Sequence, residues 1–291
     1  MLNPGFVPWS HLRRLRGGQA DPPEVFAGLY TSGSLEGLRR PVAALVGTRA
    51  ASRAGKNLAR RTARDLAAAG ITIVSGLALG IDTAAHEGAL DAGGLTIGIL
   101  GGGHEHFFPL SNRDLAARIL AAGGAVCSPY APEVEARPFR FLERNGAVAA
   151  LADAAVIVEA PERSGSLNTA GWAAGRIPVL VFPGDVDRRA VAGCLALIRD
   201  GATLVRHSAD IFEALGIAQA PVLQHLPLAN LATPLHREIF DALERDALCA
   251  DALVELTDAS AAHVFSVLTE FEFDGIVERR EGGVFARRSA K

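Results

Sequence analysis

Cysteine and lysine are scarce in this sequence, and long apolar runs are missing. Cys127, Cys194 and Cys249 lie far apart in 291 residues, which excludes a disulfide framework and a cysteine-ligated zinc ribbon. No run reaches eighteen uninterrupted apolar residues, and the N-terminus lacks the apolar core of a secretory leader, so we expect a cytoplasmic protein without a membrane span. Lys56 and Lys291 are the two lysines; arginine supplies the other basic residues. A net charge of −3 excludes a wholly basic nucleic-acid coat but allows a local basic patch.

Two common nucleotide-binding motifs and any complete catalytic set are also missing. The turn GTRAAS at 47–52 has one glycine where G-x-G-x-x-G requires three, and the next apolar run ends at Ser75 rather than at an acid for the ribose. A nicotinamide dehydrogenase is therefore disfavoured. No Walker A loop is present, and His104 and His106 lack a nearby third metal ligand. We expect no cofactor and no bound metal.

Short apolar segments alternate with alanine-rich segments from residue 42 onward. The strand candidates are VAALV, ITIVS, LTIGIL, AVCS, AAVIVEA and PVLVF, and helices are expected near 53–69, 82–92, 112–122, 140–151 and 167–175. Unbroken apolar strands are typical of parallel sheets buried on both faces. The pattern predicts an α/β, doubly wound, mostly parallel sheet whose strand-to-helix loops share one edge.

The chain divides into four predicted parts. Residues 1–40 show little periodicity and are interpreted as an N-terminal lead-in with at most one small helix, and residues 41–215 form the α/β domain. The proline-rich segment 216–233 is interpreted as a linker. Residues 234–291 contain three helical segments, then two strand-like segments around a glycine pair, which is the order of a winged helix.

Four of the predicted strand-to-helix loops are rich in glycine, serine and threonine: GTRAAS at 47–52, SGLALGID at 75–82, GGGHEHFFPLSN at 101–112 and SGSLNTA at 164–170. Glycine lets backbone N–H groups approach a ligand, and helix N-termini add partial positive charge. Tight loops of α/β folds need glycine for structural reasons too, so each loop alone fits either role. Several such loops on one edge favour a ligand with phosphates.

The predicted helix 53–69 carries a stripe of basic residues opposite its apolar side. Arg49 lies in the turn before it, and Arg53 and Lys56 lie in its first turns. Basic residues at 60–64 lie further from the loop edge and fit an ordinary solvated face. We expect Arg49, Arg53 and Lys56 to contact a polyanion.

A second basic segment, RPFRFLERN at 137–145, interleaves arginines with phenylalanines. Guanidinium groups bind phosphate, and aromatic faces stack on bases at about 1–3 kcal/mol per base. The segment therefore fits single-stranded nucleic acid, although at least one phenylalanine is expected to anchor it to the core.

Seven motifs in order carry a resemblance to a known family: VGTR, SGLALGIDTAAHEGAL, TIGILGGG, FLERN, ERSGSLNTA, VFPGDVD and IRDGATLV. Over roughly residues 21–215 the chain resembles the DNA-processing protein A (DprA/Smf) family, many members of which also carry a winged-helix tail. The resemblance implies an extended Rossmann-like fold that binds single-stranded DNA, usually as a homodimer, and loads the RecA recombinase during natural transformation. It implies no catalysis.

The residues expected to contact DNA come from the family positions, the helix stripe and the arginine–phenylalanine segment. They are Gly47, Thr48, Arg49, Arg53, Lys56, Arg140, Phe141, Arg144, Asn145, Ser164, Gly165 and Ser166.

The sequence departs from the family pattern at two motifs. The F-P-x-R-N-R segment reads FLERNG, with Leu142 and Gly146 at the changed positions, so contact there is expected to be weaker. The G-T-N-x-L-I stretch reads GCLALI at 193–198. Many members also carry a small N-terminal helical domain, for which forty residues leave no room, so a short member or a shortened chain is expected.

The third helix of the predicted winged helix is acidic. It holds Glu270, Glu272 and Asp274 without a lysine or arginine, so phosphate repulsion opposes its entry into a DNA groove. We expect this domain to bind duplex DNA weakly and to mediate protein contacts. Two other function classes stay open: a phosphoribohydrolase-like nucleotide-processing enzyme with Glu159 and SGSLNTA as its active site, and a structural adaptor acting through the winged helix.

Overall fold

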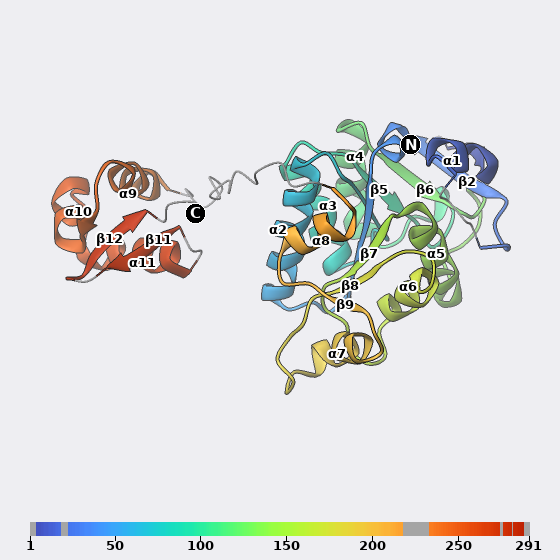
Figure 1. The fold of residues 1–291 in the computed structure, drawn as a ribbon. Helices are drawn as coiled ribbons and strands as arrows, with labels where there is room; N and C mark the ends of the chain where they lie inside the picture. The colour runs from blue at the N-terminus through green and yellow to red at the C-terminus, as the bar shows by residue number, and fades with distance from the viewer. Residues whose placement is uncertain (1–3, 19–22, 218–232, 274–275, 281, 288–291) are drawn as a thin grey trace. The chain divides into compact units, whose positions relative to one another are not determined.

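The computed structural model describes residues 4–18, 23–217, 233–273, 276–280 and 282–287. Contacts divide the chain into two compact units, residues 1–219 and 220–291 (Figure 1). The predicted linker 216–233 lies almost wholly outside the described residues. Among the helices described, none combines the length and the apolar character needed to cross a bilayer.

A nine-stranded sheet, counted over the described residues, forms the centre of the first unit, in the order β1-β2-β6-β5-β4-β3-β7-β8-β9. The strands are β1 (Gly5–Pro8), β2 (Gly28–Gly33), β3 (Val42–Val46), β4 (Thr72–Ser75), β5 (Thr96–Ile99), β6 (Ala125–Ser128), β7 (Ala154–Ile157), β8 (Val179–Val181) and β9 (Thr203–Leu204). Strands β3 to β9 are parallel, and β1 and β2 are antiparallel. The predicted doubly wound, mostly parallel sheet is confirmed. Its order reverses between β3 and β7.

Helices cover both faces of the sheet (Figure 1). They are α1 (Trp9–Leu15), α2 (Arg53–Ala68), α3 (Ile81–Asp91), α4 (Arg113–Ala121), α5 (Pro138–Leu151), α6 (Gly165–Ala173), α7 (Ala192–Arg199) and α8 (Ser208–Ala214). Alternate side chains of β3 point to opposite faces. Val42, Ala44 and Val46 pack with residues of α1, α5 and α6, whereas Ala43 and Leu45 pack with residues of α2, α3 and α8. The unbroken apolar run of β3 thus follows from burial on both sides.

The structure corrects the interpretation of residues 1–40 as a lead-in. Strand β2 pairs with β6 and β1 pairs with β2, so this segment completes one side of the sheet. The signal was weak because GFVP and GLYTSG are short, contain glycine or proline, and lack an apolar run.

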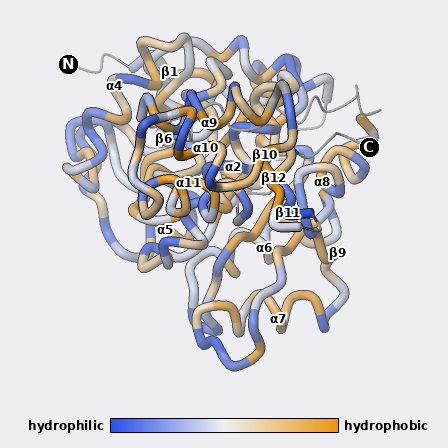
Figure 2. Tube along the Cα trace, turned by 90° about the vertical axis from the view of Figure 1, so that its left-hand side faces the viewer, coloured by the Kyte–Doolittle hydropathy of each residue, from blue (hydrophilic) through white to orange (hydrophobic). Residues whose placement is uncertain are grey.

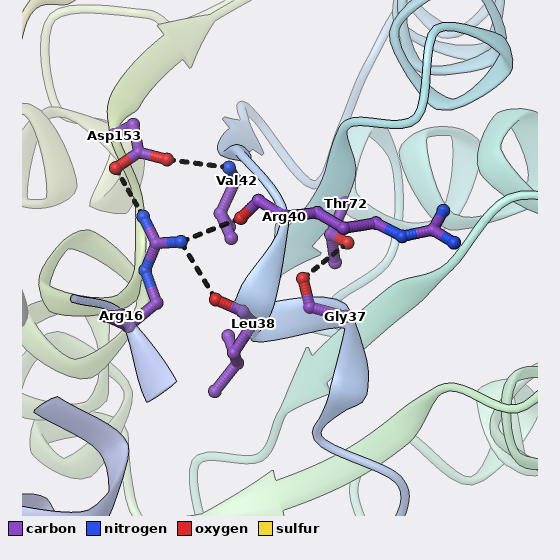
Figure 3. A network of polar contacts seen from close by, with 7 residues as sticks. All are labelled: Arg16, Gly37, Leu38, Arg40, Val42, Thr72 and Asp153. Carbon is purple, nitrogen blue, oxygen red and sulfur yellow. Dashed lines mark hydrogen bonds and ion pairs between the residues drawn. The ribbon is translucent and has the colours of Figure 1, made fainter. Parts of the chain in front are cut away.

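A buried arginine fixes the N-terminal segment to the strands (Figure 3). Arg16 donates to the carbonyl oxygens of Leu38 at 3.0 Å and Arg40 at 2.8 Å, and it forms an ion pair with Asp153. The other oxygen of that carboxylate accepts the backbone N–H of Val42 at 2.8 Å. Because Val42 begins β3 and Asp153 precedes β7, the network joins α1 to the two central strands at their amino ends.

The second unit is a winged helix, as the sequence predicts. Its elements are α9 (Pro234–Arg245), β10 (Leu248–Cys249), α10 (Ala250–Thr257), α11 (Ala261–Phe273), β11 (Val277–Arg280) and β12 (Val284–Arg287). Strand β12 lies between β10 and β11. The β11–β12 turn contains Gly282 and Gly283, with φ of 82° and 73°, values that favour glycine.

Candidate nucleic-acid interface

The point where the strand order reverses lies between β3 and β7. In open α/β sheets, ligands bind outside the carboxyl ends of the strands at this point. The loop after β3, residues 47–52, and the loop after β7, residues 158–164, flank it. Helices α2 and α6 begin directly after these loops.

A buried carboxylate caps the N-terminus of α2. Glu159 Oε2 accepts the backbone N–H of Ser52 at 2.9 Å and its hydroxyl at 3.1 Å, and Ser52 Oγ in turn accepts the N–H of Gly55 at 3.0 Å. The Glu159 side chain is 3% exposed, and its Oε1 pairs with Arg188 at 3.0 Å. The chain therefore supplies an anion of its own at the N-terminus of α2.

Gly47 and Thr48 form the turn mainly through their backbone. The N–H of Thr48 donates to the carbonyl of Glu159 at 2.7 Å, and its carbonyl accepts the N–H of Ile81 at 3.3 Å. A Cβ on Gly47 would lie 2.5 Å from Ile81 Cγ1. Glycine is thus required here by close packing, and the half-buried Thr48 accepts the N–H of Ala50 at 3.3 Å on its hydroxyl oxygen.

Arg49 is exposed and stacks on Phe141. Its guanidinium carbon lies 4.9 Å from the centre of the Phe141 ring, a cation–π geometry. Phe108 meets the same ring edge to face, with the centres 6.0 Å apart at 70°. The ring of Phe141 also lies against Gly101, where a Cβ would be 2.4 Å from Cδ1. The surface therefore presents a cation beside two aromatic rings.

Arg144, a predicted DNA contact, is 3% exposed and bonded inside the domain. It donates to the carbonyl oxygens of Gly76 and Ile99, and its Nε donates to Asn145 Oδ1 at 3.2 Å. Burial lowers the pKa of Arg144 to about 10, against the attraction of Asp82. In the structure, Arg144 thus supports the loops from inside the domain.

Two buried groups accompany Arg144 beneath the loops. Burial raises the pKa of the Asp82 carboxyl, although the charge of Arg144 and the N–H of Ala78 oppose that shift. Burial and, to a smaller extent, the charge of Arg144 together lower the pKa of His86 to about 3. This layer is a set of internal polar groups, not an exposed acid and base.

Asn145 is also internal, and it connects α5 to the beginning of α6. Its amide donates to the carbonyl of Gly165 at 3.0 Å and to Asn168 Oδ1 at 3.4 Å. Ser164 caps α6: its Oγ accepts the N–H of Ser166 at 3.3 Å and lies 2.7 Å from Ser166 Oγ. Gly165 is exposed, and a Cβ there would meet nothing closer than Leu142 at 4.0 Å. The start of α6 is therefore the open side of the switch point.

The remaining predicted contacts divide into two groups. Arg53 and Lys56 are exposed and form no ion pair with any described residue. Arg60, which was assigned to the solvated face, pairs with Asp91 at 2.5 Å. The Arg140 guanidinium lies 5.4 Å from the ring centres of both Tyr130 and Phe139.

The structure joins distant predicted residues in one chain of contacts: Arg49, Phe141, Arg144, Asn145 and Gly165. Sequence reasoning missed Phe108, although two adjacent phenylalanines in a loop were a usable signal. His104 is buried, with Nε2 3.0 Å from the Val126 carbonyl. Over the described ranges, no group of three His, Cys, Asp or Glu side chains could hold a metal ion.

Comparison with known proteins now places this geometry in a family. Residues 10–216 match the profile described as DNA recombination-mediator protein A. The chain belongs to this family, the DprA/Smf family. Residues 223–283 match the DprA winged helix domain.

Curated relatives include the putative DNA processing protein DprA of Mycobacterium tuberculosis, 41% identical over 246 residues and covering 82% of this chain. Protein Smf of Escherichia coli is 33% identical over 288 residues, which cover 92% of this chain and 75% of Smf. The chain spans 63% of the length of the M. tuberculosis relative.

Two solved structures share the fold of the first unit. DprA from Streptococcus pneumoniae has a TM-score of 0.61 at 35% identity, covering 71% of this chain and 70% of that chain. DNA processing protein A from Helicobacter pylori, studied for its mode of binding single-stranded DNA, has a TM-score of 0.62 at 28% identity, covering 74% and 96%.

Proposed function

We propose that this DprA-family protein binds single-stranded DNA along the carboxyl edge of its sheet and loads RecA onto that DNA in recombination during natural transformation. It acts in the cytoplasm as a homodimer and without catalysis. The observation that carries the proposal is the exposed Arg49 guanidinium stacked on Phe141 beside the switch point. Membership in a DNA-processing family supports it.

The exposed groups suit a single strand better than a duplex. Arg49, Arg53 and Lys56 offer positive charge for phosphates. Phe108, which is 51% exposed, offers a ring face for unstacked bases, and Phe141 holds the Arg49 guanidinium beside it. Bases inside a duplex do not expose their faces to such rings. Because phosphate contacts and stacking carry little base information, sequence preference is small.

The predicted site residues take two roles in this proposal. Arg49, Arg53, Lys56, Phe141 and the open turn at 164–165 contact the strand. Gly47, Thr48, Arg144, Asn145 and Ser166 position the loops that carry those contacts.

A nucleotide-processing enzyme is the weaker alternative. Its proposed acid, Glu159, is 3% exposed and holds the α2 N-terminus and Arg188. A carboxylate so engaged is not free to transfer protons to a substrate.

The homodimer is supported by the far side of the sheet. Strand β9 ends the sheet order, and its residues Thr203 and Leu204 are exposed. Figure 2 shows that α7 is largely hydrophobic, whereas the tip of the loop before it is hydrophilic. Among the described strands β9 pairs with β8 alone, and such an open strand edge favours pairing with a second chain. Light scattering of the protein and of Leu204→Lys tests this; we expect a dimer that the charge weakens, and a wild-type monomer would contradict it.

Single-strand binding is tested with labelled oligo-dT and the duplex of the same length over a salt series. We expect a strong preference for the single strand, weakened by salt because counterions are released on binding. Arg49→Ala should weaken binding, whereas Arg118→Ala, an exposed arginine in the last turn of α4, should not. Equal affinity for duplex, or an unaffected Arg49→Ala, would contradict the proposal.

RecA loading is tested separately, by the lag before RecA filaments form on single-stranded DNA with and without this protein. We expect a shorter lag with the wild type and not with Arg49→Ala. An unchanged lag alongside normal DNA binding would contradict loading and leave the binding proposal intact.

A further inference from the structure

A second aromatic surface lies on the side of the first unit that the N-terminal strands complete. It is a groove of about 530 Å³ between β1, β2, the loop after β6 and the start of α5. Its aromatic lining consists of Phe6, Phe26, Tyr30, Tyr130 and Phe139. The chain has only 6% aromatic residues, yet both of its tyrosines line this groove.

Two of these rings are exposed at the rim. Phe6 is 49% exposed and packs on Tyr30, with the centres 5.1 Å apart. Phe139 is 52% exposed and lies under the Arg140 guanidinium at 5.4 Å. Gly28 brings the backbone close to Phe6, because a Cβ there would lie 2.7 Å from Cζ. Large rings that line one groove and stay open to solvent suit a flat, apolar-faced ligand.

The polar groups of the groove suit a base more than a phosphate inside it. The Tyr130 hydroxyl lies 2.9 Å from Glu143 Oε2 and 3.0 Å from the Arg140 carbonyl. The Glu143 carboxylate repels phosphate and can accept the N–H groups of a base. The Arg140 guanidinium, stacked on Tyr130 and Phe139, supplies a cation at the rim for the backbone.

The start of α5 joins this groove to the Arg49 surface. Phe139 and Arg140 face the groove, whereas Phe141, in the same first turn, contacts Arg49. No acid lies in this turn, and no side chain caps it. A strand that crosses the N-terminus of α5 therefore meets positive partial charge between the two surfaces.

We propose that the groove lined by Phe6, Tyr30, Tyr130 and Phe139 takes bases of the same DNA strand that Arg49 and Phe141 bind, and so extends the binding site across α5. This inference rests on the proposed single-strand binding. An apolar peptide is the competing occupant, and it would leave DNA affinity independent of the groove.

The test compares oligo-dT of about six nucleotides, near the lower end of ordinary single-strand site sizes, with oligo-dT of about twenty nucleotides, above their upper end. Anisotropy is measured for the full chain and for Phe6→Ala, Phe139→Ala and Arg49→Ala. Phe265→Ala is the matched control, because Phe265 is also 49% exposed but lies in the winged-helix unit.

We expect Phe139→Ala and Phe6→Ala to lower the affinity for the long oligonucleotide by about tenfold, because base stacking is lost, and to leave the affinity for the short one unchanged. Arg49→Ala should weaken both lengths, and Phe265→Ala neither. If both groove variants bind the long strand as tightly as the wild type, the groove proposal is overturned. A loss of affinity in Arg49→Ala would in that case still support single-strand binding. If Arg49→Ala also has no effect, the proposed function fails as well.

A measurement on the unaltered protein covers the case in which a variant does not fold. Long oligonucleotides carry abasic nucleotides in a short window that is moved along the strand. We expect two windows that weaken binding, one for each surface. A single sensitive window overturns the groove.

Discussion

The carboxyl edge of the sheet has an outer, exposed layer and an inner, buried layer. Each layer contains an arginine, and the two arginines have different roles. Arg49 and Arg144 both lie near the Phe141 ring, with their guanidinium carbons 4.9 Å and 5.8 Å from its centre. Arg49 is exposed, whereas Arg144 is 3% exposed and bonded to two backbone carbonyls. The outer arginine is free for a ligand, and the inner one holds the loops that present it.

The physical difference is desolvation. A buried guanidinium needs a charge and hydrogen-bond acceptors to replace water, and the inner layer provides Asp82, Gly76 and Ile99. An exposed guanidinium keeps its water until a ligand arrives, so its contribution to folding is small. Substitutions should therefore affect stability in the inner layer and binding in the outer layer.

The largest effect is expected for Arg144→Ala. The change leaves the Asp82 carboxyl buried without its counter-charge, so the free energy of unfolding should fall by about 3–5 kcal/mol. Urea denaturation measures it, with Arg49→Ala as the matched control, expected within about 0.5 kcal/mol of the wild type. Equal losses of stability in the two variants would contradict the distinction between the inner and outer layers.

The pH dependence of stability probes the inner layer next. The hydroxyl of Thr96 donates to the Ile73 carbonyl at 2.8 Å, so His86 Nδ1, 2.7 Å from that hydroxyl, must donate to it. Its Nε2 is buried without a partner among the described residues. Burial lowers the pKa of His86 to about 3, so the folded state disfavours the proton that the unfolded state binds below about pH 6.5.

Stability from this group is therefore present above about pH 6.5 and is lost as the pH falls toward 3. One such histidine should lower the free energy of unfolding by about 1.4 kcal/mol between pH 7.5 and 5.5. Asp82, whose pKa is raised, acts in the opposite direction at lower pH. Denaturation of His86→Gln at both pH values should show a smaller drop than the wild type. An equal drop would show that His86 does not titrate on unfolding.

The sheet could be predicted because strands that are buried on both faces consist of continuous apolar residues. VAALV and AVCS became β3 and β6 with the expected bounds. The winged helix was predictable from its element order and glycine turn. The N-terminal strands were not, because β1 and β2 are antiparallel, short and mixed in exposure, and pairing with β6 across about 95 residues leaves no local signal.

The sequence was enough to predict which segments form the site, but not the role of each residue in it. The turn at 47–49 and the segment at 140–145 do meet, through Phe141. Sequence gives arginine at both 49 and 144, and only the packing of α5 against the loops shows which one is buried. Likewise, nothing near Ser52 indicates that Glu159, more than a hundred residues away, fills the α2 terminus.

The outer layer is tested by Arg49→Ala in a binding experiment. Loss of a phosphate contact and of the cation beside Phe141 should lower the affinity for oligo-dT by about tenfold, equivalent to about 1.4 kcal/mol. The slope of log affinity against log salt should fall by about 0.7, the value for one phosphate contact on a single strand. An affinity loss with an unchanged slope would show that Arg49 acts by stacking and not through phosphate.

The smallest effect is expected for Lys56→Ala, at the outer margin of the same surface. Lys56 is an exposed point charge in α2 with no ion pair among the described residues, so it should contribute long-range attraction and little geometry. We expect a loss of about threefold at low salt that vanishes near 1 M salt, where the Debye length is about 3 Å. Arg61→Ala is the matched control, since Arg61 is exposed on the same helix but further from the loop edge. If both variants lose affinity equally, the DNA contacts α2 along its length, and the outer layer includes residues further from the loop edge.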